Sequence, residues 1–179
     1  MEPTKNVINK YANWTTDLIR EDVQKNTFPY ACLMVNIEGD FNMSSVFRNG
    51  NAFGCSKLFY HGQKKWDKRG AVGIYNYSFI SHLSSLEDVR LLKERYTLIA
   101  LECGEGEASY MRNFKWNTEK EPCIVVGAEC GGISRNILEM CDHIVEIPMY
   151  GSVRSINAAT AAGIAMCDLV TKRYASKNL

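Results

Sequence analysis

The stretch that decides the fold is Ile124-Val-Val-Gly-Ala-Glu-Cys-Gly-Gly-Ile-Ser-Arg135, in which an apolar run passes directly into a glycine-rich turn. The apolar run Cys123 to Val126 predicts a buried strand, and Ser134 to Cys141 predicts the helix that follows it. Backbone without side chains lets a ligand lie directly against N–H and C=O groups. The G-x-E-x-x-G turn from Gly127 to Gly132 is therefore a candidate binding loop, although an ordinary strand-to-helix turn would look the same.

Strands and helices alternate on both sides of this stretch. This alternation predicts an α/β fold whose mostly parallel sheet is flanked by helices and joined by right-handed crossovers. The predicted strands are Tyr30–Ile37, Lys57–Tyr60, a possible short one within Ala71–Tyr77, Tyr96–Glu102, Cys123–Val126 and Ile144–Ile147. The predicted helices are Val7–Lys25, Ser44–Phe53, Ser85–Arg95, Ser134–Cys141 and Ser155–Tyr174.

Parallel sheets of this kind bind ligands at the carboxyl ends of their strands. Those ends are predicted at residues 36–42, 102–107, 127–132 and 148–155. The long segment from Cys103 to Glu121 is predicted to be a loop, and loops of that length in a compact domain are often functional.

Length and composition set limits on the kind of protein. The chain has 179 residues, 46% of them hydrophobic, which suits one well-packed domain without a membrane span. We expect it to be intracellular, and its seven scattered cysteines to be reduced thiols that bind no metal.

The net charge of +1 is low for a protein that binds nucleic acid, but the basic residues are unevenly distributed. Five of them fall in one short segment with interleaved aromatic residues, which suggests a surface that binds RNA. A solvated loop with ordinary surface lysines remains an equal alternative. The five candidates are Lys57, Lys64, Lys65, Lys68 and Arg69.

Two further stretches are more specific than the glycine turn. Val145-Glu-Ile-Pro-Met-Tyr-Gly-Ser-Val-Arg-Ser-Ile-Asn157 runs from a predicted strand through a loop into a helix rich in alanine. Asn42-Met-Ser-Ser-Val-Phe-Arg-Asn-Gly-Asn-Ala-Phe-Gly54 sets an asparagine six residues before Arg48. Together the three stretches resemble the motifs of the SpoU family of RNA ribose 2′-O-methyltransferases, within the SPOUT superclass. The resemblance covers about Tyr30 to Tyr174.

The resemblance implies a C-terminal deep trefoil knot, S-adenosylmethionine as the cofactor, an RNA substrate and a homodimer. It divides the chain into an N-terminal helical extension, residues 1–28, and a SPOUT methyltransferase domain, residues 29–179. The positions that match the family's cofactor-binding motifs are Leu101, Gly127, Ile147, Met149 and Ile156. Those that match its catalytic motifs are Asn42, Arg48, Glu129, Ser155 and Asn157.

Arg48 is the principal catalytic candidate. Because a guanidinium in a protein stays protonated, we expect Arg48 to clamp an RNA phosphate and to stabilise the developing alkoxide, while its role as a base stays open. Ser155 and Asn157 are expected to orient the ribose hydroxyl or Arg48, and Glu129 to have a positioning role. Glu102 could favour a cationic sulfonium, although a solvated acid is the simpler interpretation.

Three functions remain open at this point. Methylation of a ribose 2′-hydroxyl in tRNA is the first, because small relatives often act on tRNA, and methylation of ribosomal RNA is the second. The third is an RNA-binding dimer that keeps the methyltransferase fold without catalysis. We expect the protein to act in the cytoplasm. A dinucleotide-binding dehydrogenase is disfavoured, because the Gly104-Glu-Gly106 segment lacks the third glycine and the helix that such a site needs.

Overall fold

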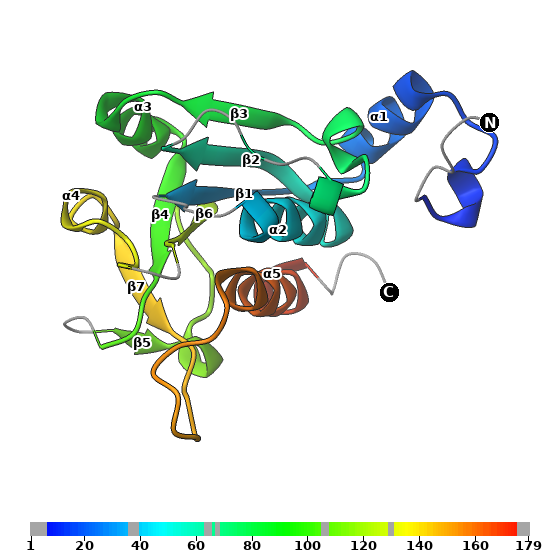
Figure 1. Cartoon of the computed structure of the whole chain (residues 1–179). Helices are drawn as coiled ribbons and strands as arrows, with labels where there is room; N and C mark the ends of the chain where they lie inside the picture. The colour runs from blue at the N-terminus through cyan, green and yellow to red at the C-terminus, as the bar shows by residue number, and fades with distance from the viewer. Residues whose placement is uncertain are drawn as a thin grey trace.

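The computed structural model describes residues 7–35, 40–62, 66, 69–104, 108–128 and 131–174, and for residues 40, 41 and 69 only the backbone. Its centre is a seven-stranded sheet in the order β3-β2-β1-β6-β4-β7-β5, with every pairing parallel (Figure 1). The strands are β1 (Phe28–Val35), β2 (Cys55–His61), β3 (Ile80–Leu83), β4 (Tyr96–Leu101), β5 (Ser109–Tyr110), β6 (Glu121–Val126) and β7 (His143–Glu146). The α/β fold with a parallel sheet is as predicted.

Two hydrophobic cores lie on opposite faces of the sheet, because successive side chains of a strand alternate in direction. In β1, Cys32 and Met34 belong to one core, whereas Ala31 and Leu33 belong to the other. The central strands are buried on both sides, which explains why their sequences read as continuous apolar runs rather than as alternating ones.

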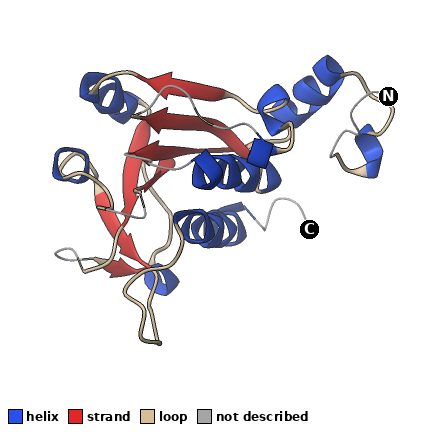
Figure 2. Cartoon of the chain, viewed as in Figure 1, coloured by secondary structure: helices blue, strands red, loops and turns tan. Residues whose placement is uncertain are grey.

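Helices cover both faces of the sheet (Figure 2). Helices α2 (Asp40–Ala52) and α5 (Ala158–Tyr174) cover one face and pack against each other. Helices α3 (Leu86–Leu91) and α4 (Arg135–Leu138) cover the other. Helix α1 (Thr16–Lys25) lies apart from these layers, beside the amino ends of the strands.

Several predicted boundaries were wrong, each for a local reason. The segment Val7–Lys25 is not one helix, because Thr15 caps α1 by accepting a hydrogen bond from the Leu18 N–H group, and only a 3-10 turn (Asn9–Tyr11) precedes it. Helix α5 begins three residues later than predicted, because Asn157 accepts hydrogen bonds from the backbone N–H groups of Ala159 and Thr160.

The short strand expected within Ala71–Tyr77 was also wrong. Gly73 has φ 85°, a left-handed conformation, and introduces the 3-10 turn Ile74–Asn76. The strand lies at Ile80–Leu83 instead, and the predicted loop from Cys103 to Glu121 contains the two-residue strand β5 and the 3-10 turn Met111–Asn113.

The described residues contain neither a membrane-spanning helix nor a cluster of metal-binding side chains. None of their helices combines the length and the apolar character that crossing a membrane requires. No group of three or more histidine, cysteine, aspartate or glutamate side chains is placed so that it could hold a metal ion.

Candidate functional site

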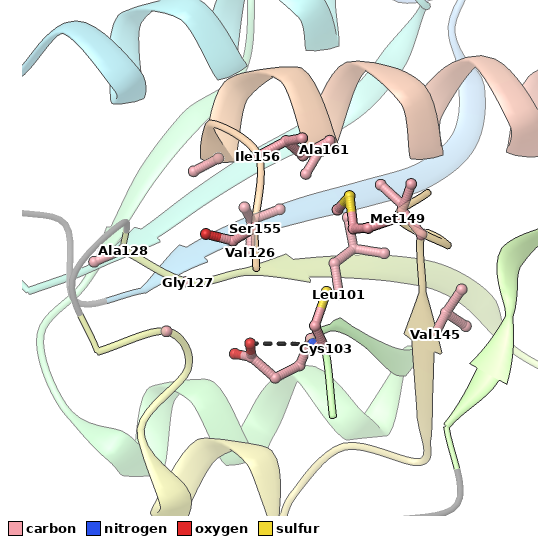
Figure 3. A pocket seen from close by; sticks show the side chains of 14 residues that line it. Leu101, Cys103, Val126, Gly127, Ala128, Val145, Met149, Ser155, Ile156 and Ala161 are labelled. Carbon is pink, nitrogen blue, oxygen red and sulfur yellow. Dashed lines mark hydrogen bonds between the residues drawn. The ribbon is translucent and has the colours of Figure 1, made fainter. Parts of the chain in front are cut away.

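A cavity of about 170 Å³ opens at the carboxyl edge of the sheet, where β4, β6 and β7 end (Figure 3). We call it the carboxyl-edge cavity. All five residues predicted to bind the cofactor line it, although they come from three separate segments of the chain: Leu101, Gly127, Ile147, Met149 and Ile156. Most of its wall is apolar, with a few polar groups between, which is the usual composition of a small-molecule site.

Gly127 and Gly132 shape this cavity by letting two stretches of backbone touch. A Cβ atom on Gly127 would lie 2.3 Å from the carbonyl carbon of Gly132, so a side chain there would displace the turn. The absence of a side chain at Gly127 is thus required by the chain itself. Gly132 has φ 57°, and a Cβ atom on it would lie 2.5 Å from Glu102 Oε2.

Glu102 is the acidic group of the cavity. One of its carboxylate oxygens accepts a hydrogen bond from the Ile133 N–H group (3.0 Å), and the other accepts one from the Cys103 N–H group (3.2 Å). These bonds fix the carboxylate between β4 and the glycine turn. Of the two interpretations that the sequence left open for Glu102, a partner for a cationic sulfonium and a solvated acid, the second was favoured, whereas in the structure Glu102 forms part of the wall.

The thiol of Cys103 lies beside Glu102 in the same wall. Burial raises its pKa above the ordinary value of 9.0, and the negative charges of Glu146 and Glu102 raise the pKa further. A thiol in this position stays protonated near neutral pH, so Cys103 is a poor nucleophile although it borders the cavity.

The catalytic candidates do not all lie together in the structure. Asn157 donates a hydrogen bond from Nδ2 to Oδ1 of Asn42 (2.8 Å), which joins the start of α5 to the start of α2. Ser155 lies in the wall of the carboxyl-edge cavity. The fifth candidate, Glu129, lies outside the described residues, as does Cys130.

Arg48 lies in a different hollow. It is exposed on α2, about 9 Å further along the helix axis than Asn42 at 1.5 Å per residue. It lines a space of about 510 Å³ beside α1, which we call the Arg48 hollow. This hollow shares no lining residue with the carboxyl-edge cavity. Within the described chain, Arg48 makes no ion pair.

The predicted basic patch can be described only in part. Lys64, Lys65 and Lys68 lie outside the described residues, and of Arg69 only the backbone is described, in the 3-10 turn Arg69–Ala71. Lys57 lies over the ring of Phe79, with 4.2 Å between its Nζ and the ring centroid, and Arg20 of α1 lies 4.8 Å from the same centroid. Two cations thus share one aromatic ring.

The outer surface of α2 and α5 carries a shallow groove. It is lined by residues of both helices, including Ser45, Asn49, Gly163, Ile164 and Cys167. Asn49 donates a hydrogen bond to the carbonyl oxygen of Ala159 (2.8 Å), and its amide nitrogen lies 3.0 Å from where a Cβ atom on Gly163 would be. Gly163 therefore allows the two helices to approach closely.

Sequence reasoning missed several residues of the site. Residues 102–107 were predicted to follow a strand end, and Glu102 was considered as a partner for a sulfonium, but neither Glu102 nor Cys103 was selected as a site residue. Ala158 and Ala161 also line the cavity from α5, but helical alanines carry no signal that separates a cavity wall from an ordinary core position.

Comparison with known proteins places this geometry in a family. Residues 29–167 match the model of the SpoU rRNA Methylase family. A putative TrmH family tRNA/rRNA methyltransferase from Bacillus subtilis, YacO, is 27% identical over 168 residues, which cover 88% of this chain and 64% of that protein. A tRNA (guanosine(18)-2′-O)-methyltransferase from Aquifex aeolicus is 27% identical over 160 residues, which cover 87% of this chain and 75% of that protein. This chain thus spans less than two thirds of YacO.

Solved structures agree on the fold. The A. aeolicus TrmH/SpoU tRNA modifying enzyme superimposes with a TM-score of 0.75 at 24% identity, covering 88% of this chain and 82% of its own. The SpoU methyltransferase AviRb from Streptomyces viridochromogenes, crystallised with AdoMet, gives a TM-score of 0.70 at 23% identity. The match covers 82% of this chain and 59% of the AviRb chain. With 139 of its 179 residues matched by the family model and this fold around them, the chain belongs to the SpoU rRNA Methylase family.

Proposed function

We propose that this protein is an S-adenosylmethionine-dependent methyltransferase that modifies a ribose 2′-hydroxyl in structured RNA, with tRNA as the first candidate substrate. The observation that carries the proposal is the carboxyl-edge cavity, where five residues chosen from motifs of the sequence line one space. The related A. aeolicus enzyme is named for 2′-O-methylation of a tRNA guanosine, and AviRb was crystallised with AdoMet, which supports both substrate and cofactor.

The residues of the carboxyl-edge cavity fit this cofactor chemically. Leu101, Ile147 and Met149 offer apolar walls, and the carboxylate of Glu102 offers a negative charge to a cationic ligand. The volume of about 170 Å³ is below the roughly 300–1,000 Å³ typical of ligand sites, so a molecule of this size would also extend into the open mouth.

When bound, the cofactor supplies a methyl group on a positively charged sulfur, which the ribose 2′-oxygen accepts as it loses its proton. The chain's own residues would position that oxygen. We assign Arg48 to an RNA phosphate beside the reacting ribose, where a planar guanidinium can make two parallel hydrogen bonds and offset developing negative charge. Ser155, which lies in the cavity wall, would orient the hydroxyl, and Asn157 holds the start of α5 against Asn42. Glu129 keeps its proposed positioning role.

The separation of Arg48 from the carboxyl-edge cavity supports a homodimer in which one chain supplies the arginine and its partner supplies the cofactor. The groove on α2 and α5 is the surface that we assign to this contact. It carries Ile164, which is 41% exposed, together with Cys167 and Gly163, and it borders Asn157. Apolar side chains on an exposed helix face are typical of protein contacts.

Further parts of the proposal rest on family membership. A deep trefoil knot would form from the chain segments around the carboxyl-edge cavity. Residues 1–28 would act as an extension that helps to select the RNA, together with Lys57 and the four other basic residues predicted beside it. We expect the protein to act in the cytoplasm, where mature tRNA and ribosomes occur. Ribosomal RNA remains the second candidate substrate.

The decisive experiment has two readouts. Calorimetric titration should give one S-adenosylmethionine site per chain, and mass spectrometry of RNA from cells with and without the gene should reveal one 2′-O-methylated nucleoside that depends on it. Cofactor binding without any dependent nucleoside would favour a non-catalytic RNA-binding dimer. The absence of cofactor binding would overturn the proposal.

A further inference from the structure

The loop between β7 and α5 projects from the body of the molecule (Figure 1). Its two ends form part of the carboxyl-edge cavity, through Met149 on one side and Ser155 on the other. Between these ends, Tyr150 is 85% exposed and Val153 is 60% exposed. A tyrosine ring held in solvent one residue from a ligand cavity is placed to meet whatever approaches that cavity.

A second exposed tyrosine lies beside this loop. Tyr110 of β5 is 45% exposed, and the guanidinium of Arg112 lies over its ring, with 5.4 Å between Cζ and the ring centroid. Arg112 also donates a long, weak hydrogen bond to the hydroxyl of Tyr150 (3.5 Å). Arg112 therefore links two exposed rings from distant parts of the sequence, and we call the three residues the Tyr110–Arg112–Tyr150 platform.

The backbone under the platform is held firmly. Lys172, in the last turns of α5, donates hydrogen bonds to the carbonyl oxygens of Met111 (2.7 Å), Arg112 (3.2 Å) and Phe114 (3.2 Å). Its Nζ also pairs with the Asp168 carboxylate at 2.8 Å. Because α5 fixes the turn from which Arg112 extends, the protein backbone under the platform is already ordered. Binding of a ligand there does not have to offset the entropy of ordering that backbone.

The charge of the platform is positive. In the part of the chain that the structure describes, Arg112 forms no ion pair with a carboxylate. The same is true of Arg154, which lies in the same loop as Tyr150. The nearest acid by strand register is Glu146, which lies opposite Tyr110, and its carboxylate is not bonded to Arg112. Exposed aromatic rings beside a guanidinium that pairs with no carboxylate are the combination that binds stacked bases and phosphates of single-stranded nucleic acid.

We propose that the Tyr110–Arg112–Tyr150 platform stacks an unpaired RNA base next to the ribose to be methylated, while Arg112 contacts a neighbouring phosphate. The inference rests on the proposed function, since it identifies the form of RNA that reaches the carboxyl-edge cavity. Stacking tolerates every base, because each has a flat π face. The platform therefore selects an unpaired nucleotide and leaves base identity to other contacts.

Fluorescence anisotropy with two labelled probes tests this proposal, a 12-nucleotide single-stranded RNA and a 12-base-pair RNA duplex. Tyr150→Ala should weaken binding of the single strand about 5- to 150-fold, the range expected from one lost base stack, and change duplex binding by less than about twofold. Tyr150→Phe keeps the ring and should retain most of the affinity. Leu91→Ala, at a 51% exposed position on the opposite face of the sheet, is the control.

Two parallel measurements separate this proposal from the others. Calorimetry should give the same S-adenosylmethionine affinity for Tyr150→Ala as for the unmodified chain, and sedimentation should give the same oligomeric state. Equal binding of the single strand by both proteins, or no binding by either, would overturn the platform. A loss of dimers with unchanged RNA affinity would also overturn it and assign the loop to a second copy. Absent methyl transfer with intact stacking would contradict the proposed function alone.

Discussion

The carboxyl-edge cavity and the Arg48 hollow lie towards opposite ends of α2, and they differ in how their residues are brought together. The cavity is built from strand ends and loops that the sequence motifs identify, so recognition of the motifs was enough to name five of its fourteen lining residues as cofactor-binding candidates. The hollow combines the motif residue Arg48 with side chains of the N-terminal segment, such as Val7, Tyr11 and Val23, which no motif indicates. A motif can thus select a residue such as Arg48 without indicating which distant parts of the chain surround it.

The largest effect should come from the hollow. Arg48→Ala should lower methyl transfer about 10²- to 10³-fold, the usual loss when one group that stabilises developing charge is removed, and leave cofactor affinity within about twofold. Single-turnover assays and calorimetry measure the two quantities. Arg48→Lys keeps the charge but loses the planar fork, so a bidentate phosphate clamp should fail in this variant as well. Near-normal turnover by Arg48→Ala would move the catalytic assignment to Ser155 and Asn157.

A smaller effect is expected from the groove between α2 and α5. Ala161 and Ala162 of α5 are unsuitable positions for a test, since Ala162 is fully buried and Ala161 lines the carboxyl-edge cavity. Ile164→Arg instead introduces a charge into the groove between α2 and α5, which a partner chain would bury. The variant should weaken dimerisation about 10- to 100-fold, because a buried charge without a partner is costly. Sedimentation equilibrium measures this change. Leu91→Arg, at an exposed position on the other face of the sheet, should leave the dimer intact.

The strand pattern explains why the fold could be predicted well and the site only partly. Strands such as β1 and β6 are buried on both faces, so their apolar runs are unmistakable. Strands β3 and β5 have four and two residues, and they depend on pairing with β2 and β7 rather than on their own composition. Pairing of this kind is set by the tertiary structure, which no local pattern records.

The same reasoning applies to single residues of the site. Met149 and Ile156 could be placed because they flank a recognisable loop, and the structure puts both in the cavity wall. The surroundings of Arg48 could be predicted only in part, because many residues of the hollow, such as Val7, Tyr11 and Val170, lie far from Arg48 in sequence. For Glu102, the sequence signal for a site residue was its position directly after β4. In the structure this position decides its role, although an acid in a loop is more often solvated.

Mixing two inactive variants tests whether the cavity and the hollow work across a dimer. Ala161→Arg should fill the carboxyl-edge cavity, and Arg48→Ala should remove the clamp. If each active site joins the arginine of one chain to the cavity of its partner, a randomised equal mixture should recover about a quarter of the unmodified activity, since half of the dimers are mixed and carry one intact site. No recovery, with mixed dimers shown by native mass spectrometry, would place both elements in one chain.

The smallest effect concerns the thiol that borders the cavity. Because the pKa of Cys103 is raised above 9.0, less than about a tenth of it is thiolate at pH 8, and labelling by iodoacetamide should be slow and should speed up only as the pH rises towards and above 9. Saturating S-adenosylmethionine should slow labelling of Cys103 a further fewfold, because the ligand covers the cavity wall. Cys167 lies on α5 in the groove that we assign to the dimer contact, outside the cavity wall, so its labelling should depend on dimerisation and should not respond to the cofactor. Peptide mass spectrometry reports both sites in one sample, so protection of Cys103 alone assigns the cofactor to the carboxyl-edge cavity. Equal labelling of Cys103 with and without bound cofactor would place the ligand elsewhere.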